Sequence, residues 1–313
     1  MQDILTLAEA TQDATIKTEL QALSGAKYTA EISHKRVSVL DLLERFPSVS
    51  LPFDAFLSLL PPMRVRQYSI SSSPLKDASR ATLTYSLLSE PSLANPSLTH
   101  TGVASTYLST LTAGDKVHLS VRPSHPAFHL PTTSPETTPI ILVAAGSGIA
   151  PFRGFIQERA AQIAAGRKLA KAVLYFGCRH PEIDDIYREE FDHWEGMGAV
   201  SVRRAYSRHP HDRHDHPTIG DPNGTGNGRK YVQDILWEER EEVIRLWNAG
   251  AKFYVCGSRN LAEGVKGAVL RIAMEMYREK KEAGENVEEL DEQGALRWFD
   301  GIRNERYAMD VFD

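Results

Sequence analysis

The chain has 313 residues, of which 42% are hydrophobic and 25% charged, so it is long enough for two globular domains. Its net charge of −5 argues against general nucleic-acid binding, and no apolar run approaches the length of a membrane span. The first residues lack the basic and apolar regions of a signal peptide. The two cysteines, Cys178 and Cys256, fit a reduced, cytoplasmic compartment, and neither has a metal-ligand spacing.

Residues 1–60 have the apolar spacing of helices, and we predict a helical connecting segment there. One amphipathic helix is expected from Leu5 to Leu23, and a second around residues 39–43. Pro52 and the pair Pro61-Pro62 end this segment.

Residues 61–135 differ in character, because short β-rich runs at 65–71, 81–88 and 116–121 alternate with Pro, Ser, Asn and Gly. This pattern is typical of an antiparallel barrel or sandwich. One helix is expected near residues 104–111. The polar, proline-bearing stretch 132–139 indicates a domain boundary.

Strand-like and helical runs alternate over residues 136–313, which predicts a parallel sheet with helices on both faces. Ligands of such sheets bind at the carboxyl ends of the strands. The expected strands are 140–144, 172–176, 200–205 and 253–256, and the expected helices are 152–165, 185–194, 232–247 and 261–280.

The run Arg66-Gln67-Tyr68-Ser69 places a guanidinium, an aromatic ring and a hydroxyl on one expected strand. A guanidinium matches the oxygens of a phosphate, and a tyrosine ring can stack on a flat heterocycle. Such a strand suits a flavin dinucleotide. Taken alone, these residues favour an ordinary edge strand with outward polar side chains.

The run 139–152 combines a strand, a turn with Gly146, Ser147 and Gly148, and a helix that starts near Pro151. Glycines let the backbone approach a pyrophosphate, and the helix N-terminus offers free amides and partial positive charge. The spacing differs from the G-x-G-x-x-G fingerprint, so a tight turn is an equally good interpretation of this run alone.

Ser207 and Arg208 end the third expected strand of this region. An arginine at this place accommodates a 2′-phosphate, so Arg208, with Arg229 and Tyr231 across the next loop, favours NADPH. Without the glycine turn upstream, a solvated basic loop explains them better. The histidine-rich run 209–216 leads into the glycine-rich run 220–228, so we interpret both as a flexible surface insertion and predict no metal site.

These motifs, in this order, resemble those of the FAD- and NADPH-binding part of diflavin reductases of the NADPH–cytochrome P-450 reductase type. The resemblance covers nearly the whole chain. It is strongest to the reductase end of self-sufficient fatty-acid hydroxylases, in which a haem monooxygenase and its reductase are fused. The shared motifs begin at Arg66, Gly102, Gly146, Tyr175, Ala205, Tyr231, Tyr254 and Arg306.

The resemblance implies a ferredoxin-NADP-reductase-like fold of α/β plus all-β type. An incomplete antiparallel FAD-binding barrel at 61–135, with the helical segment, is followed by a Rossmann-like, parallel-sheet NADP-binding domain at 136–313. The chain is expected to begin after the first barrel strands. The expected partners, an FMN-binding flavodoxin-like domain and a haem monooxygenase domain, are absent from it.

The resemblance also implies which residues contact the two cofactors, with Tyr68 against the isoalloxazine ring of FAD. The implied FAD contacts are Arg36, Arg66, Tyr68, Ser69, Thr84, Ser86, Gly102, Val103, Ala104 and Ser105. The implied NADPH contacts are Gly146, Ser147, Gly148, Arg179, Ser207, Arg208, Arg229 and Tyr231.

The resemblance assigns hydride transfer to Ser69, Cys256 and Asp310. Ser69 is expected to hydrogen-bond near flavin N5, Cys256 to pack beside nicotinamide C4, and Asp310 to stabilise positive charge that develops on the nicotinamide ring. Phe312 takes the place of an aromatic that stacks on the flavin and must move aside for the nicotinamide. The family commonly has tryptophan at Phe312 and often an acid at Ser258, which implies weaker exclusion of NADH and one missing member of the catalytic group.

The expected function is therefore hydride transfer from NADPH to FAD, followed by single-electron transfer to an FMN domain and a cytochrome P-450-type haem monooxygenase. A free-standing reductase with a small or iron–sulfur acceptor is one alternative. The other is a truncated fragment that binds NADPH, does not retain FAD and is not an active enzyme, because an open barrel leaves unpaired strand edges.

Overall fold

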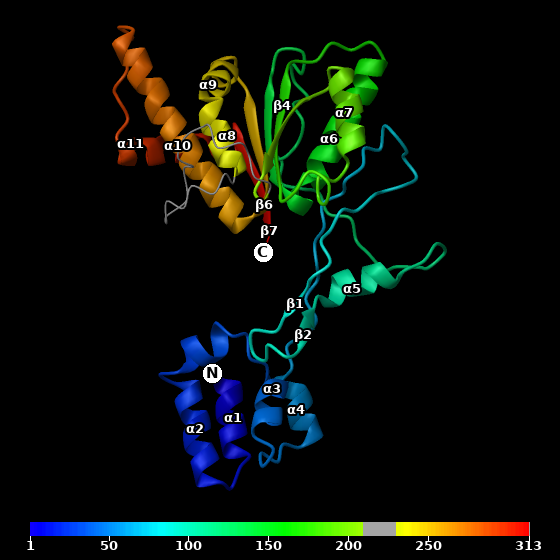
Figure 1. The fold of residues 1–313 in the computed structure, drawn as a ribbon, viewed down its shortest axis with the longest axis vertical. Coiled ribbons are helices and arrows are strands. Elements are labelled where there is room, and N and C mark those ends of the chain that lie inside the picture. The colour runs from blue at the N-terminus through cyan, green and yellow to red at the C-terminus, as the bar shows by residue number, and fades with distance from the viewer. Residues whose placement is uncertain (209–229, 313) are drawn as a thin grey trace. The chain divides into compact units, whose positions relative to one another are not determined.

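The computed structural model describes residues 1–208 and 230–312. The chain divides into two compact units, of which the first comprises residues 1–67 and 87–116 and the second residues 68–86 and 117–313. Figure 1 labels the helices and strands of both units.

The first unit is mainly helical. Its elements are α1 (Gln2–Glu9), α2 (Ala14–Ser24), the π-helical turn η1 (Tyr28–Ser33), α3 (Val39–Arg45), α4 (Phe53–Leu59), β1 (Ser89–Pro91), β2 (Thr99–Thr101) and α5 (Val103–Thr110). Leu7, Leu20, Leu23 and Leu42 are almost fully buried in its core.

The helix expected from Leu5 to Leu23 is two helices, because Asp13 starts a new one. Its carboxylate accepts the backbone N–H groups of Thr15 and Ile16, which caps α2.

The β-rich runs at 65–71, 81–88 and 116–121 form no strands, although all three lie within the described residues. A single antiparallel bridge joins Ile70 to Leu83, and the one hairpin of the first unit pairs β1 with β2. Val65, Leu119 and Val121 are 73%, 71% and 74% exposed, so these side chains line no barrel interior. The prediction of regular strands was wrong, whereas the expectation of an incomplete barrel is confirmed.

The second unit contains a five-stranded parallel sheet of order β5-β4-β3-β6-β7. The strands are β3 (Ile140–Ala145), β4 (Ala172–Cys178), β5 (Ser201–Tyr206), β6 (Lys252–Ser258) and β7 (Tyr307–Phe312). The helices are η2 (Gly146–Ile149, a 3-10 turn), α6 (Ala150–Ala164), α7 (Arg188–Gly196), α8 (Val232–Glu238), α9 (Arg240–Asn248), α10 (Arg259–Glu282) and α11 (Glu292–Ile302).

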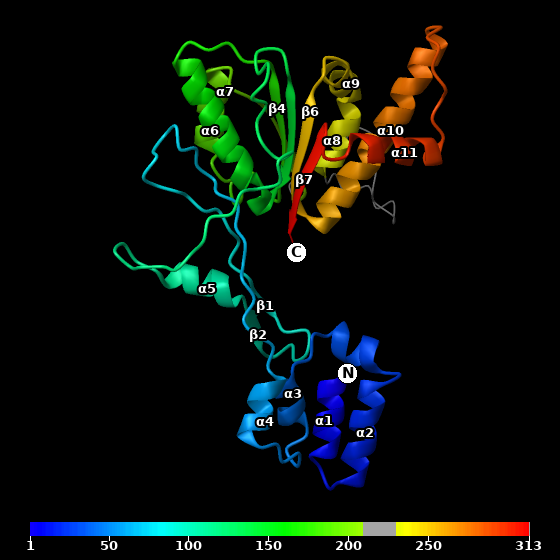
Figure 2. The ribbon, with the colours of Figure 1, turned by 180° about the vertical axis from the view of Figure 1, so that it is seen from behind.

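Helices cover both faces of this sheet, as the alternating runs predict. Figures 1 and 2 show α6 and α7 on one face, and α8, α9 and α10 on the other. Successive side chains of β3 point to opposite faces of the sheet. Leu142 packs with Phe152 and Phe191 in one core, and Val143 packs with Leu236 and Val265 in the other. None of the described helices is both long and apolar enough to cross a membrane.

Strands β3 to β6 lie where the sequence predicts them, but the carboxyl-terminal part of the unit differs. The helix expected over 232–247 is divided at Glu239 into α8 and α9. Helix α11 and strand β7 were not predicted. Arg306 fixes the start of β7, because its guanidinium donates to the carbonyl oxygens of Trp247 and Ala251 and lies 3.6 Å from the centre of the Trp247 ring.

Candidate active site

The carboxyl ends of β3 and β6 form the switch point of the sheet, because the chain continues from β3 to β4 on one side while β6 lies on the other. Gly146 turns the chain there with φ +54°, and nothing lies within 4 Å of where its Cβ would be. At Gly148 a Cβ would lie 2.2 Å from the carbonyl oxygen of Cys256. The turn therefore needs glycine at 148 to close onto β6, and it leaves open space at 146.

Three predicted catalytic residues meet beside this turn. Cys256 of β6 is in register with Asp310 of β7. The Ser69 hydroxyl donates to the Asp310 carboxylate over 2.6 Å. The structure thus brings Ser69, Cys256 and Asp310 together, although 241 positions separate Ser69 from Asp310.

The Cys256 side chain is fully buried. Burial, and secondarily the charge of Asp310, raises the pKa of its thiol well above the ordinary value. The thiol is therefore neutral near pH 7, so it can pack against a ligand but not attack one.

Phe312 follows Asp310 by two residues at the end of β7, is 41% exposed and is in register with Ser258. The Ser258 hydroxyl accepts the Leu261 N–H and caps α10. Ser258, where the resemblance leads us to expect an acid, thus starts a helix.

Tyr68, Thr84 and Ser86 also belong to the second unit. The Tyr68 ring meets Tyr85 edge to face, with 5.7 Å between ring centres. The Thr84 hydroxyl donates to Ser71 and is also hydrogen-bonded to Tyr187, whereas Ser86 is exposed.

The other predicted FAD contacts belong to the first unit. Arg36 and Arg66 are exposed, and Arg66 donates to the carbonyl oxygen of Arg64. Gly102 precedes α5, and Val103 and Ala104 form its first turn with Ser105. Ser105 is buried, and its hydroxyl accepts the N–H of Leu88.

The predicted NADPH contacts gather after β4 and β5. Both strands stay paired beyond their ends, because Ser207 N–H donates to Cys178 and Arg208 N–H donates to Arg179. The Arg208 side chain is exposed. Arg179 is ion-paired with Asp184 at 2.9 Å.

Asp184 also accepts the backbone N–H groups of Arg179 and His180. Partial burial by itself raises the pKa of Asp184, but these hydrogen bonds together lower it by a larger amount. The net pKa therefore lies below the ordinary value. The carboxylate therefore fixes the loop that carries Arg179.

Tyr231 precedes α8 and is 43% exposed. Its N–H donates to Asp234 over 2.8 Å. Sequence reasoning missed Asp234, although an acid three residues after a helix start is a capping signal. Arg229 and the histidine-rich run lie outside the described residues.

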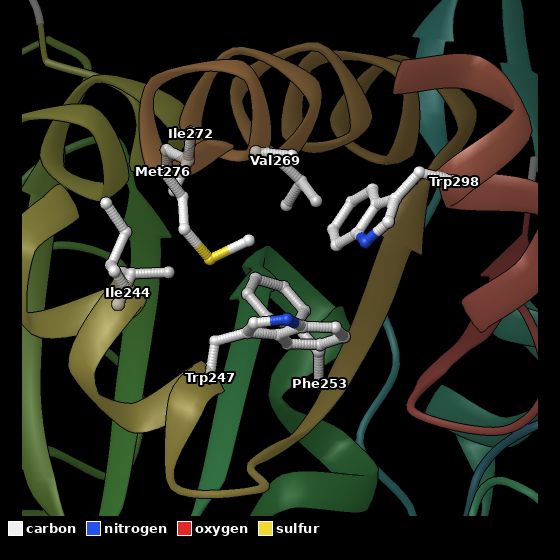
Figure 3. A pocket seen from close by; sticks show the side chains of 9 residues that line it. Ile244, Trp247, Phe253, Val269, Ile272, Met276 and Trp298 are labelled. Atoms are coloured by element: carbon white, nitrogen blue, oxygen red, sulfur yellow. The ribbon is translucent and has the colours of Figure 1, made fainter. Parts of the chain in front are cut away.

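A small apolar cavity lies elsewhere in this unit, between α9, α10, α11 and β6 (Figure 3). Trp247, Phe253, Met276 and Trp298 are among its lining residues. It contains none of the predicted site residues and lacks the polar groups that a nucleotide needs.

Residues 2–107 match the family model of an FAD binding domain, and residues 142–267 match that of an oxidoreductase NAD-binding domain. The matches and the sheet together define a ferredoxin-NADP-reductase-like pair of domains.

Comparison with curated relatives indicates which kind of reductase the chain resembles. The chain is 55% identical to a bifunctional cytochrome P450/NADPH–P450 reductase of Fusarium oxysporum, over 99% of the chain and 27% of that relative. It is 44% identical to a self-sufficient cytochrome P450 monooxygenase of Oidiodendron maius, over 99% of the chain and 27% of that relative. The chain thus spans about a quarter of the length of these relatives. It combines an FAD binding domain with an oxidoreductase NAD-binding domain, and it is homologous to the reductase part of fused P450/NADPH–P450 reductases.

Proposed function

We propose that this module transfers a hydride from NADPH to FAD and passes electrons to an FMN-binding flavodoxin-like domain and a cytochrome P-450-type haem monooxygenase. The names of the relatives support the cytochrome P-450 partner, and the family resemblance implies the FMN-binding domain. When bound, the two cofactors supply the hydride donor and its acceptor. We also propose the division into residues 1–60, 61–135 and 136–313, and a cytoplasmic location, which the two unpaired cysteines favour.

The observation that carries the proposal is the meeting of Ser69, Cys256 and Asp310 at the switch point. The Ser69 hydroxyl is a donor that can turn from Asp310 to a flavin nitrogen. Asp310 supplies a carboxylate where positive charge develops, and the neutral Cys256 thiol fills the space beside it. Phe312 is exposed enough to cover this place and to move aside.

The residues present fit both cofactors. Gly146 leaves open space at the turn before α6, where a pyrophosphate can approach the backbone without meeting a side chain. Ser147, Gly148, Arg179, Ser207, Arg208, Arg229 and Tyr231 are our remaining proposed NADPH contacts. Our proposed FAD contacts are Arg36, Arg66, Tyr68, Ser69, Thr84, Ser86 and Gly102 to Ser105, and they supply cations, a ring and hydroxyls.

A visible spectrum of the purified chain tests the proposal. We expect flavin absorbance that NADPH bleaches without oxygen, and cytochrome c reduction that rises when an FMN domain is added. Absent flavin absorbance after incubation with FAD would favour the truncated fragment that binds NADPH only. Equal cytochrome c reduction without the FMN domain would favour a free-standing reductase.

A further inference from the structure

Beside the candidate active site lies a polar cluster, two members of which, Arg153 and Tyr187, have no part in the chemistry proposed above. It joins residues 68–86 to α6 and α7 within the second unit. The segment doubles back on itself through the Ile70–Leu83 bridge and the Ser71 N–H, which donates to the Thr82 carbonyl oxygen over 2.7 Å. Because it forms no regular strand, side-chain contacts must hold its position.

Tyr187 provides the first of these contacts. Its hydroxyl lies 2.8 Å from the Thr84 hydroxyl, which in turn donates to Ser71 over 2.9 Å. Ser71 is fully buried. Tyr187 itself has φ +63°, a conformation uncommon for a residue other than glycine, and it directly precedes α7. The uncommon backbone conformation thus occurs at the residue whose hydroxyl reaches Thr84.

Arg153 of α6 provides the second contact. It donates to the carbonyl oxygen of Ser71 over 2.8 Å, and its other terminal nitrogen binds both oxygens of Glu190 over 2.8 and 3.0 Å. Its guanidinium carbon lies 4.4 Å from the centre of the Tyr187 ring. The Arg153 side chain is only 12% exposed, so little solvent competes for these bonds.

We propose that Arg153 and Tyr187 are positioning residues that clamp segment 68–86 to the NAD-binding domain and so place Ser69 for hydride transfer. Arg153 contacts Ser71 directly, and Tyr187 contacts it through Thr84. Ser69 lies two residues before Ser71. The proposal rests on the proposed function, because Tyr68, Ser69, Thr84 and Ser86 are FAD contacts there. The clamp itself consists of contacts between residues of this chain.

Hydrogen exchange in the full chain without cofactor tests the clamp directly. Tyr187→Phe removes one hydroxyl and keeps the ring, and Tyr277→Phe on α10 is the matched control. We expect the amides of Ser71 and Thr82 to exchange about threefold to tenfold faster in Tyr187→Phe, as loss of one neutral hydrogen bond predicts. Unchanged exchange at both amides would overturn the clamp.

The FAD-loaded chain tests the positioning role. In Tyr187→Phe we expect the limiting rate of flavin reduction to fall about threefold to tenfold, while the Kd for NADPH stays unchanged. Thr84→Val removes the hydroxyl that Tyr187 reaches, so the double variant Tyr187→Phe/Thr84→Val should lose no more than Thr84→Val alone. Additive losses, or a rate equal to the parent in Tyr187→Phe, would contradict the positioning role.

The two experiments separate the failure of each proposal. If the parent chain binds no FAD, the proposed function fails, but the exchange experiment still decides whether the clamp exists.

Arg153→Lys keeps the positive charge but loses the planar guanidinium that binds Ser71 and Glu190 at the same time. It should therefore speed exchange of the Ser71 amide about threefold to tenfold as well.

Discussion

Arg208 is the side chain through which the nucleotide preference can be tested most simply. Its backbone is held just after β5, because its N–H donates to the carbonyl oxygen of Arg179. Its side chain is exposed, so the guanidinium is accessible to a ligand. Arg208→Ala should weaken NADPH binding about tenfold to hundredfold, because a charge-assisted bond to the 2′-phosphate is lost, and should leave NADH binding nearly unchanged.

Dissociation constants for both nucleotides measure this difference. Arg245→Ala, which removes a 73% exposed arginine side chain from α9, is the control and should change neither constant. Equal weakening of NADPH and NADH in Arg208→Ala would show that Arg208 does not bind the 2′-phosphate.

At the scale of elements, the turn between β3 and α6 depends on Gly148. Gly148→Ala would place a Cβ against the Cys256 carbonyl oxygen, so we expect a loss of about 1–3 kcal/mol or more in the free energy of unfolding. Gly267→Ala in α10 has open space around its Cβ and should instead stabilise the chain by about 0.5–1 kcal/mol. Denaturant unfolding of both variants checks this, and equal stability of the two would contradict the close approach.

The start of α8 predicts a dependence of stability on pH. Asp234 is buried; one carboxylate oxygen accepts the Tyr231 N–H, and the other has no hydrogen-bond partner among the described residues. Burial, and then the charge of Glu238, raises its pKa above 3.8. The folded state therefore holds this proton more tightly than the unfolded state, so the buried charge destabilises the chain above the raised pKa and stops doing so below 3.8.

Asp234→Asn removes this charge and keeps an acceptor for Tyr231. The free energy of unfolding of the variant, relative to the parent, should therefore rise between pH 4 and pH 8. Urea unfolding at several pH values measures it, and a difference that stays constant with pH would show that the carboxyl group does not titrate as proposed.

The elements that the sequence predicts well are those whose residues decide their own structure. Leu142 and Val143 are buried on opposite faces of β3, so a continuous apolar run identifies the strand. Tyr307 to Phe312 has less apolar character, and its strand depends on pairing with β6 and on Arg306, neither of which a local pattern reveals. Val65 and Leu119 have β propensity but find no ladder, so they remain exposed.

The candidate site shows the same division. The glycine turn and Arg208 could be identified from the sequence, and the family resemblance supplied Ser69, Cys256 and Asp310. The contacts of Thr84 with Tyr187 and of Ser71 with Arg153 could not, because they join residues 103 and 82 positions apart through side chains of ordinary appearance.

At the scale of the whole molecule, we propose that segment 68–86, β6 and β7 together form one hydride-transfer site. Asp310 lies at its centre because β7 pairs in parallel with β6 at the sheet edge. Its carboxylate accepts a hydrogen bond from the Ser69 hydroxyl. The proposed catalytic group of Ser69, Cys256 and Asp310 therefore depends on the fold of the whole second unit rather than on any one motif.

The most direct test is the rate of flavin bleaching when FAD-loaded Asp310→Asn is mixed with NADPH in the absence of oxygen. Asparagine keeps an acceptor for Ser69 and removes the negative charge, so we expect a rate about tenfold to hundredfold below that of the parent, with bound FAD unchanged. Asp300→Asn on the exposed side of α11 should bleach at the parent rate. Bleaching of Asp310→Asn at the parent rate would show that the Asp310 carboxylate does not assist hydride transfer.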